Sequence, residues 1–230
     1  MKKWNRRELL KNFLLGLSAL GAGALGLRQT LAPTPAYGEL GEFGKFLIAQ
    51  GEKPGEAPPI ARKPTASDSM GPYYKEGAPF RGRLMPQDAP GTPMLIRGHV
   101  YGHDTRKPLQ GATIDVWQAD DSGSYHGMDE KDNYLYRARM RTTRRGLYRF
   151  ETVHPGRYGF GFWARPSHIH FYIRHPDYQP LVTQLYFRGD PRLGDHERAR
   201  PSLIIPLKKV SWGKTYELGN FDIVLVRKRG

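Results

Sequence analysis

Hydrophobic and polar residues alternate in short runs over the second half of the chain. The clearest runs are residues 96–101, 113–118, 147–150, 168–173, 181–187 and 221–225. Alternation with a period of two places successive side chains on opposite faces of a β-strand. Turn-forming residues separate the runs, and no helical stripe longer than about three turns follows residue 70. The pattern predicts an all-β fold, a β-sandwich of mostly antiparallel strands with long loops at its site and few helices.

The chain divides into three parts by composition. Residues 1–37 predict an export signal peptide and the start of a linker, and residues 38–90 an extended arm rich in proline and glycine. Residues 91–230 predict the β-sandwich domain, which is expected to be the catalytic one. A chain of 230 residues is long enough for one domain with a sizeable core.

The amino-terminal segment has the features of an export signal. Basic residues, including the pair Arg6-Arg7, precede a run of 15 uncharged residues from position 13 to 27. That run is short for a membrane-spanning helix, which needs about 20 residues. The paired arginines resemble the twin-arginine export motif, which implies export of a folded protein and a periplasmic or secreted location. An ordinary secretory signal or an uncleaved membrane anchor is the alternative reading.

The absence of cysteine and the excess of basic residues exclude several kinds of site and partner. The chain has no cysteine, which excludes disulfides, thiolate-bound metals and cysteine nucleophiles. Its formal net charge is +14, of which the first 28 residues contribute +5. A basic body attracts anions, but no nucleic-acid-binding module is recognisable, and the basic residues are scattered among the strands. We therefore expect a small-molecule partner, no nucleic acid, and membrane contact only through the leader.

The candidate site begins with His168-Ile169-His170. Residues i and i+2 of a strand share a face, so both imidazoles can reach one metal ion. Two tyrosines, Tyr125 and Tyr158, each end a glycine-containing turn upstream of the pair. A phenolate is a hard anionic oxygen donor suited to a hard trivalent ion, and two phenolates would offset the cost of burying that charge. On the histidines alone, zinc is the usual interpretation.

Several segments resemble the intradiol ring-cleavage dioxygenases, and most of all their protocatechuate 3,4-dioxygenase branch. They are residues 71–74 (GPYY), 111–119 (GATIDVWQA), 123–125 (GSY), 146–152 (GLYRFET), 155–158 (PGRY), 165–171 (RPSHIHF), 183–191 (TQLYFRGDP) and 221–225 (FDIVL). The resemblance implies a non-haem Fe(III) enzyme that uses O₂ to cleave a catechol-type aromatic compound between its two hydroxyls, giving a cis,cis-muconate.

The resemblance also implies residue roles. The four metal ligands would be Tyr125, Tyr158, His168 and His170, with Tyr158 leaving the metal when substrate arrives. Arg165 would stabilise negative charge on the bound ring, and Gln184 would orient the groups around the metal. Trp117 and Tyr148 are expected in the core rather than in the site.

Departures from the family pattern concern the pocket. Residues 159–162 read Gly-Phe-Gly-Phe where relatives often have Pro-Trp, and Ala164 stands where they usually have tryptophan. We therefore expect a pocket of different shape. The sequence leaves open which catechol is the substrate, and whether the chain works alone or in an oligomer of identical or related chains.

Two other functions fit parts of the sequence. Residues 96–112 also resemble non-catalytic sandwich modules, namely transthyretin-like carriers and carboxypeptidase regulatory domains. A zinc hydrolase would explain the histidine pair, but it lacks a well-placed carboxylate base. Neither alternative explains the tyrosines, Arg165 and Gln184 together.

Overall fold

A computed structural model describes residues 41, 42, 44, 45, 63–159 and 164–229. The predicted export signal at residues 1–37 and the unusual turn at residues 160–162 lie outside these residues. Clustering of the chain gives two units, Met1–Thr34 and Pro35–Gly230, and every described residue belongs to the second. No helix among the described residues is long and apolar enough to cross a membrane.

Sheet 1 has five strands. Their order is β10-β1-β9-β8, and β4 also pairs with β1. The strands are β1 Pro93–Gly102, β4 Leu147–Val153, β8 Leu207–Trp212, β9 Lys214–Asn220 and β10 Ile223–Leu225. Two of its pairs, β1 with β10 and β1 with β9, are parallel.

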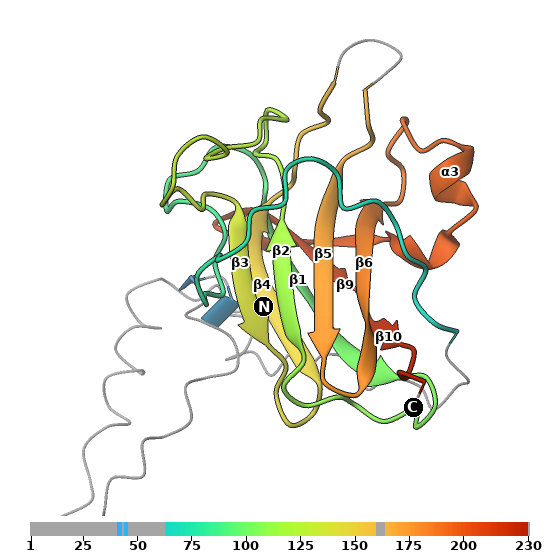
Figure 1. Ribbon diagram of the computed structural model, residues 1–230. Coiled ribbons are helices and arrows are strands. Elements are labelled where there is room, and N and C mark those ends of the chain that lie inside the picture. The colour runs from blue at the N-terminus through green and yellow to red at the C-terminus, as the bar shows by residue number, and fades with distance from the viewer. Residues whose placement is uncertain (1–40, 43, 46–62, 160–163, 230) are drawn as a thin grey trace, which may run out of the picture. The chain divides into compact units, whose positions relative to one another are not determined.

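Sheet 2 also has five strands, in the order β3-β2-β5-β6-β7. They are β2 Thr113–Trp117, β3 Arg137–Arg141, β5 His168–His175, β6 Tyr178–Phe187 and β7 Ile204–Ile205. All its pairs are antiparallel except β6 with β7. The strands β3, β2, β5 and β6 stand side by side at the front of Figure 1.

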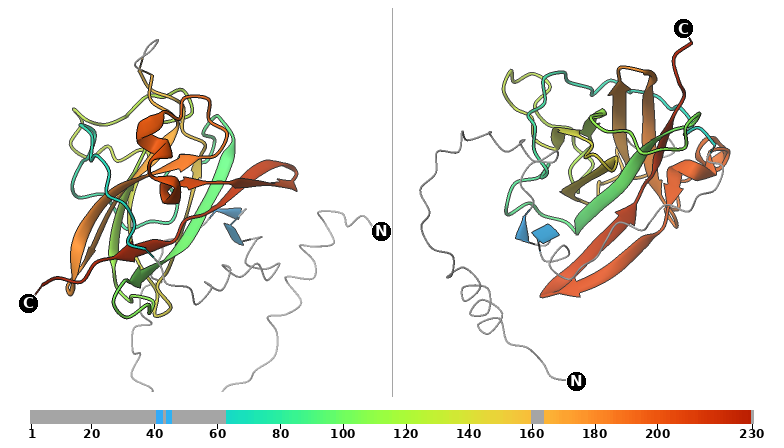
Figure 2. Two further views of the ribbon diagram at one scale, coloured as in Figure 1. Left: turned by 90° about the vertical axis from the view of Figure 1, so that its right-hand side faces the viewer. Right: turned by 90° about the horizontal axis from the view of Figure 1, so that it is seen from below.

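The core lies between the two sheets, which are seen from the side in Figure 2. Phe171 of β5 packs against Phe221, with ring centroids 5.2 Å apart, and against Tyr148 of β4 at 6.1 Å. Ile169, Phe171 and Ile173 are fully buried in this core. The alternate residues of β5 therefore face away from sheet 1, toward what we call the outer face of sheet 2.

The predicted fold class is confirmed: the described chain is mostly β, with two sheets and little helix. Two short helical elements lie between β6 and β7, namely α3 Asp195–Arg198 and the 3₁₀ turn Pro201–Leu203. The sheets are more mixed than expected, because three strand pairs are parallel. The alternation did not predict β3, β8 or β9.

A segment without regular structure crosses the outer face of sheet 2. We call residues 63–83 the crossing segment; it runs over β6, β5 and β2 toward β3 (Figure 1). Backbone hydrogen bonds fix it at both ends: Asp68 N donates to Val182 O of β6 (3.0 Å), and Arg81 N donates to Arg139 O of β3 (3.1 Å). The crossing segment therefore covers the face to which the histidines point.

Candidate functional site

The two histidines lie side by side on the outer face, as their spacing predicted. His168 and His170 are both buried in β5, and their Nε2 atoms are 3.2 Å apart. Strand pairing places His170 beside Trp117 of β2 and Gln184 of β6. Three neighbouring strands thus carry side chains toward the same point.

Both imidazoles are held in the uncharged form. Burial lowers the pKa of His168 to about 4, and burial together with the nearby His168 lowers the pKa of His170 well below its ordinary value. His168 Nδ1 donates to Pro166 O at 2.6 Å, which leaves Nε2 without a proton. An uncharged imidazole with a free lone pair is the form that binds metal ions.

The two predicted tyrosines reach the histidines from separate loops. The hydroxyl of Tyr125 lies 3.4 Å from His168 Nε2. Tyr158 packs edge-on to Tyr125 with ring centroids 5.6 Å apart, and its ring centroid is 5.7 Å from that of His168. Burial raises the pKa of Tyr125, and the positive charges of Arg137 and Arg165 partly oppose that rise.

A third tyrosine completes the aromatic cluster; it lies in the segment 71–74 that resembles the family, but no site role was predicted for it. Tyr73 of the crossing segment stacks on Tyr125 with ring centroids 4.0 Å apart and an interplanar angle of 11°. It also packs edge-on to Tyr158 at 5.7 Å. The ring of Tyr125 is therefore held by the crossing segment, a contact that the sequence pattern of residues 71–74 does not show.

Trp117 is placed differently from our expectation. It is fully buried, but it lies on the outer face rather than between the sheets, and its ring stacks on His170 at 4.8 Å and 6°. Gly71 of the crossing segment also lies close to His170, since a Cβ there would be 3.2 Å from His170 Cε1. Gly71 also has a φ of +67°, which favours glycine. Tyr148, by contrast, is in the core as expected.

Arg165 and Gln184 lie beside the histidines in a buried polar network. Arg165 Nη2 donates to Tyr186 Oη at 3.0 Å and to Gln184 Oε1 at 3.3 Å. Tyr186 Oη in turn donates to Gln184 Oε1 at 2.8 Å and lies 3.1 Å from Asp68 Oδ2. Glu197 Oε1 is 3.7 Å from Arg165 Nη2. Two buried carboxylates thus balance the Arg165 cation and fix its direction.

The loop that carries Tyr125 is anchored on both sides. The Asp120 carboxylate accepts hydrogen bonds from Ser122 N and Ser124 N, both 2.9 Å, and pairs with His126 at 2.7 Å. Arg137 of β3 is fully buried and donates to His126 O and to Tyr73 O. These contacts hold the Tyr125 ring in the site before any ligand binds.

The donor set fits a hard metal ion. Two nitrogens that bind one ion in adjacent positions at about 2.1 Å are themselves about 3 Å apart, and the two Nε2 atoms are 3.2 Å apart. The Tyr125 hydroxyl lies at hydrogen-bonding distance from one of them. No group of three or more His, Cys, Asp or Glu side chains that could hold a metal ion occurs within the described residues. The phenol oxygens are therefore the oxygen donors available beside this histidine pair.

The structure brings all six predicted site residues into one region. These are Tyr125, Tyr158, Arg165, His168, His170 and Gln184. The sequence missed Asp68, Tyr73, Tyr186 and Glu197. Tyr186 shares a strand face with Gln184 at spacing i+2, which is a signal that could have found it. The other three come from distant segments.

Comparisons with known proteins give one consistent result. A family model described as dioxygenase matches residues 69–227. The chlorocatechol 1,2-dioxygenase of Rhodococcus opacus is 33% identical over 218 residues, covering 83% of this chain and 84% of that protein. The protocatechuate 3,4-dioxygenase beta chain of Burkholderia cepacia is 38% identical over 155 residues, covering 59% of this chain and 65% of its own.

Solved structures show the same fold. The dioxygenase domain of a dioxygenase and carbohydrate-binding protein fusion from Streptomyces sp. SirexAA-E aligns with a TM-score of 0.59 at 34% identity, covering 71% of this chain and 98% of that domain. The catechol 1,2-dioxygenase from Pseudomonas arvilla C-1 aligns with a TM-score of 0.65 at 28% identity, covering 72% of this chain and 63% of that one.

Proposed function

The chain belongs to the intradiol ring-cleavage dioxygenases, and on that premise we propose that it opens a catechol bearing a carboxylate, of the protocatechuate type, to a cis,cis-muconate. Ring cleavage of a catechol-type compound is the activity of the family, and the family typically uses Fe(III). The proposal adds the substrate class and the residue roles. The observation that carries the roles is the convergence of two histidine Nε2 atoms and the Tyr125 hydroxyl.

We assign the metal ligands to Tyr125, Tyr158, His168 and His170. An iron(III) ion in this site would supply a Lewis acid and electron acceptor for the two catechol oxygens. Tyr125 is clamped by a stacked ring and an anchored loop, so it suits a ligand that stays bound. Tyr158 makes edge contacts with the surrounding rings. It suits a ligand that swings away and accepts a catechol proton at its Oη.

Arg165 and Gln184 act on the substrate ring and its surroundings. The Arg165 cation is directed by Tyr186 and Gln184 and can stabilise negative charge that develops on the bound ring. Gln184 Nε2 donates to Ser69 O at 2.7 Å, which fixes its amide in the network. Closure of the site by the crossing segment limits the access of water.

A carboxylate-bearing substrate is supported by charge and by similarity. The chain carries a formal net charge of +14, which raises the local concentration of anions. The beta chain of a protocatechuate 3,4-dioxygenase is 38% identical to the matched part. We expect kcat/KM for protocatechuate to exceed that for catechol by about tenfold, the value of one charge-assisted hydrogen bond. Steady-state O₂ uptake with protocatechuate, catechol and hydroxyquinol measures it, and equal values would contradict the proposed class.

The ligand assignment has a spectroscopic test. Iron-loaded protein should absorb in the visible range through tyrosinate-to-iron(III) charge transfer, and a catechol added without O₂ should shift the band. Tyr125→Phe should remove most of the band and weaken iron retention. Tyr73→Phe is the matched control, because it alters the ring stacked on Tyr125 without removing a proposed ligand. An unchanged spectrum in Tyr125→Phe would overturn the assignment.

We also propose that the protein is exported. The paired arginines at positions 6 and 7, followed by the uncharged run at 13–27, support a twin-arginine-type signal. Its location would then be periplasmic or secreted.

A further inference from the structure

The outer face of sheet 2 continues beyond the histidines into a groove. On β5, Tyr172 and Arg174 follow His170 at intervals of two residues and share its face. Strand pairing sets Arg141 of β3 and Arg174 on either side of Thr113 in β2. The groove over these strands has a volume of about 650 Å³, within the range of about 300–1,000 Å³ found for small-ligand sites.

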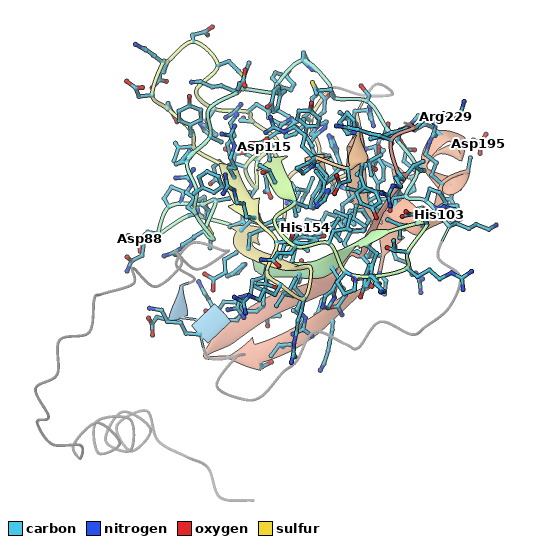
Figure 3. All side chains as sticks on the ribbon, turned by 60° about the horizontal axis from the view of Figure 1, so that its bottom comes forward. Asp88, His103, Asp115, His154, Asp195 and Arg229 are labelled. Atoms are coloured by element: carbon cyan, nitrogen blue, oxygen red, sulfur yellow. The ribbon has the colours of Figure 1, made fainter. Side chains whose placement is uncertain are left out.

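The groove is strongly basic. Its walls include Arg139, Arg141, Arg174 and Lys228, and none of the described residues that line it is acidic. Asp115, labelled in Figure 3, lies beneath in β2 and is nearly fully buried. Its carboxylate accepts a hydrogen bond from Arg139 Nε at 2.8 Å and another from Arg174 Nη2.

One buried carboxylate between two guanidinium groups leaves positive charge uncompensated. Glu76 also acts electrostatically on Arg139, and the Asp177 carboxylate lies 3.8 Å from His175 of the groove wall, yet four cations still face three carboxylates. Arg174 Nε is buried and has no hydrogen-bond partner in the described structure. The exposed cations of the wall, Arg141 and Lys228, can offer N–H donors and positive charge to an anion.

The same groove presents aromatic surface. Phe80 is 54% exposed, although it is a large apolar residue. The guanidinium carbons of Arg139 and Arg141 lie 5.8 and 5.4 Å from its ring centroid. Arg174 lies over the Tyr172 ring at 4.8 Å. A guanidinium that lies over a ring can still present N–H groups at its edge to a planar carboxylate.

We propose that this groove is a second ligand site, one that binds an aromatic carboxylate with its carboxylate between Arg141 and Arg174 and its ring against Phe80. Adjacent strands are about 4.8 Å apart, so these two arginines start about 10 Å apart and can meet at one carboxylate. An inorganic anion would leave the exposed Phe80 ring without a role. A second copy of the chain fits poorly, because each copy is basic, with a formal charge of +9 beyond residue 28 (+14 in all, less +5 for the first 28 residues).

The site is separate from the histidine pair. Arg174 lies four positions along the strand from His170, which corresponds to about 13 Å. Tyr74 of the crossing segment stands between the two regions, packed against Trp117 at 5.0 Å and against Tyr172 at 5.8 Å. Occupation of the groove therefore needs neither iron nor a catechol, and it does not depend on the proposed substrate.

The test is a titration with 4-fluorobenzoate followed by ¹⁹F NMR on the iron-loaded protein. This probe has no hydroxyls and cannot be ring-cleaved. We expect Arg141→Gln to weaken its binding about tenfold, the value of a charge-assisted hydrogen bond, and Phe80→Ala to weaken it about fivefold, from lost ring contact. Both side chains are exposed, so both variants should fold. Lys209→Gln, which removes an exposed charge from β8 of sheet 1, should leave binding unchanged.

Three results would overturn the proposal. Weaker binding in Arg165→Gln but not in Arg141→Gln would mean that the probe occupies the ring-cleavage site. Competition by inorganic phosphate at the same affinity, with no effect of Phe80→Ala, would mean a simple anion site. Binding of heparin that is much tighter than that of 4-fluorobenzoate and is lost in Arg141→Gln would mean a polyanion site.

Discussion

At the scale of single residues, the hydroxyl of Tyr186 is the junction of the polar network. It lies within hydrogen-bonding distance of Arg165, Gln184 and Asp68 at once. Burial, with the negative charge of Asp68, raises the pKa of Tyr186, so the group stays protonated and can donate. Its ring also packs beside that of His168, with centroids 6.0 Å apart, but its hydroxyl bonds to Arg165, so we regard Tyr186 as a positioning residue for Arg165.

Tyr186→Phe should therefore lower kcat/KM more than it lowers stability. Loss of the Tyr186 hydroxyl, which accepts a hydrogen bond from Arg165, should reduce kcat/KM about tenfold. It should lower the free energy of unfolding by about 1 kcal/mol. Tyr148→Phe is the control, since its hydroxyl donates to Phe221 O inside the core. It should cost similar stability and leave kcat/KM unchanged. If both variants have wild-type kcat/KM, Tyr186 does not position Arg165.

Much of the site could be predicted at this scale, for a physical reason. His168 and His170 share a face because side chains in a strand alternate, and that alternation is visible in the sequence. Asp68 and Glu197 could not be predicted, because Asp68 lies 97 positions before Arg165 and Glu197 lies 32 positions after it. Asp68 and Glu197 contribute negative charge to the network around Arg165, and a single buried carboxylate has no recognisable pattern in the local sequence.

At the scale of elements, the short turn at residues 41–45 is held by Glu151 of β4. Gly41 N and Gly44 N donate to its two carboxylate oxygens at 2.8 and 2.5 Å. Burial raises the pKa of Glu151 despite these donors and the nearby cations of Arg83 and Lys45. The folded state therefore binds the Glu151 proton more tightly than the unfolded state does.

This shift sets the sign of a pH effect. A carboxyl whose pKa is raised by folding stabilises the fold below its unfolded pKa, which is 4.5 for glutamate, and that contribution is lost as pH rises through the folded value. Wild type should therefore lose stability relative to Glu151→Gln between pH 4 and pH 7. Urea unfolding of both proteins at the two pH values measures the difference. A difference that grows in the opposite direction would contradict the burial effect.

The pairing of β1 depends on a glycine. Gly98 lies so close to the segment after β9 that a Cβ would be 1.8 Å from Phe221 O. Gly98→Ala must push the backbone apart and should cost about 3 kcal/mol. At Gly194 the nearest atom to a built Cβ is 3.5 Å away, so Gly194→Ala should cost well under 1 kcal/mol. Equal denaturation midpoints for the two variants would show that the backbone relaxes freely.

The strands were predicted unequally well. The runs that became β1, β2, β4, β5 and β6 alternate clearly because one face of each packs in the core. β3 has the sequence Arg-Ala-Arg-Met-Arg, and its three arginines are not typical of a buried strand. In the structure Ala138 and Met140 face the core, and Arg137 is buried on the outer side. β8 and β9 carry many charged residues, which obscures their period.

At the scale of the whole molecule, the main open prediction is export through the amino-terminal leader. The described residues all belong to the unit Pro35–Gly230, and the predicted leader lies outside them. The leader was predicted from sequence alone, through its basic start and uncharged run. Neither the fold nor the relatives bear on that prediction, so it needs its own experiment.

Arg6→Lys combined with Arg7→Lys should block export by the twin-arginine route while leaving the folded enzyme intact. The charge is unchanged, so only the identity of the pair is tested. Lys2→Arg combined with Lys3→Arg is the matched control and should be exported normally. Fractionation of a two-membrane bacterial host measures the periplasmic share. Export of the Arg6/Arg7 variant at the control level would indicate an ordinary secretory signal.

The two faces of β5 serve different purposes, and this has a consequence for how the protein can evolve. Ile169, Phe171 and Ile173 hold the sheets together, while His168 and His170 stand on the other side with Tyr172 and Arg174. Duplicated copies of such a gene could diverge in the compounds they accept through changes on the outer side and in the crossing segment alone. The stability of the fold would be preserved, because the core residues Ile169, Phe171 and Ile173 do not contact the bound compound.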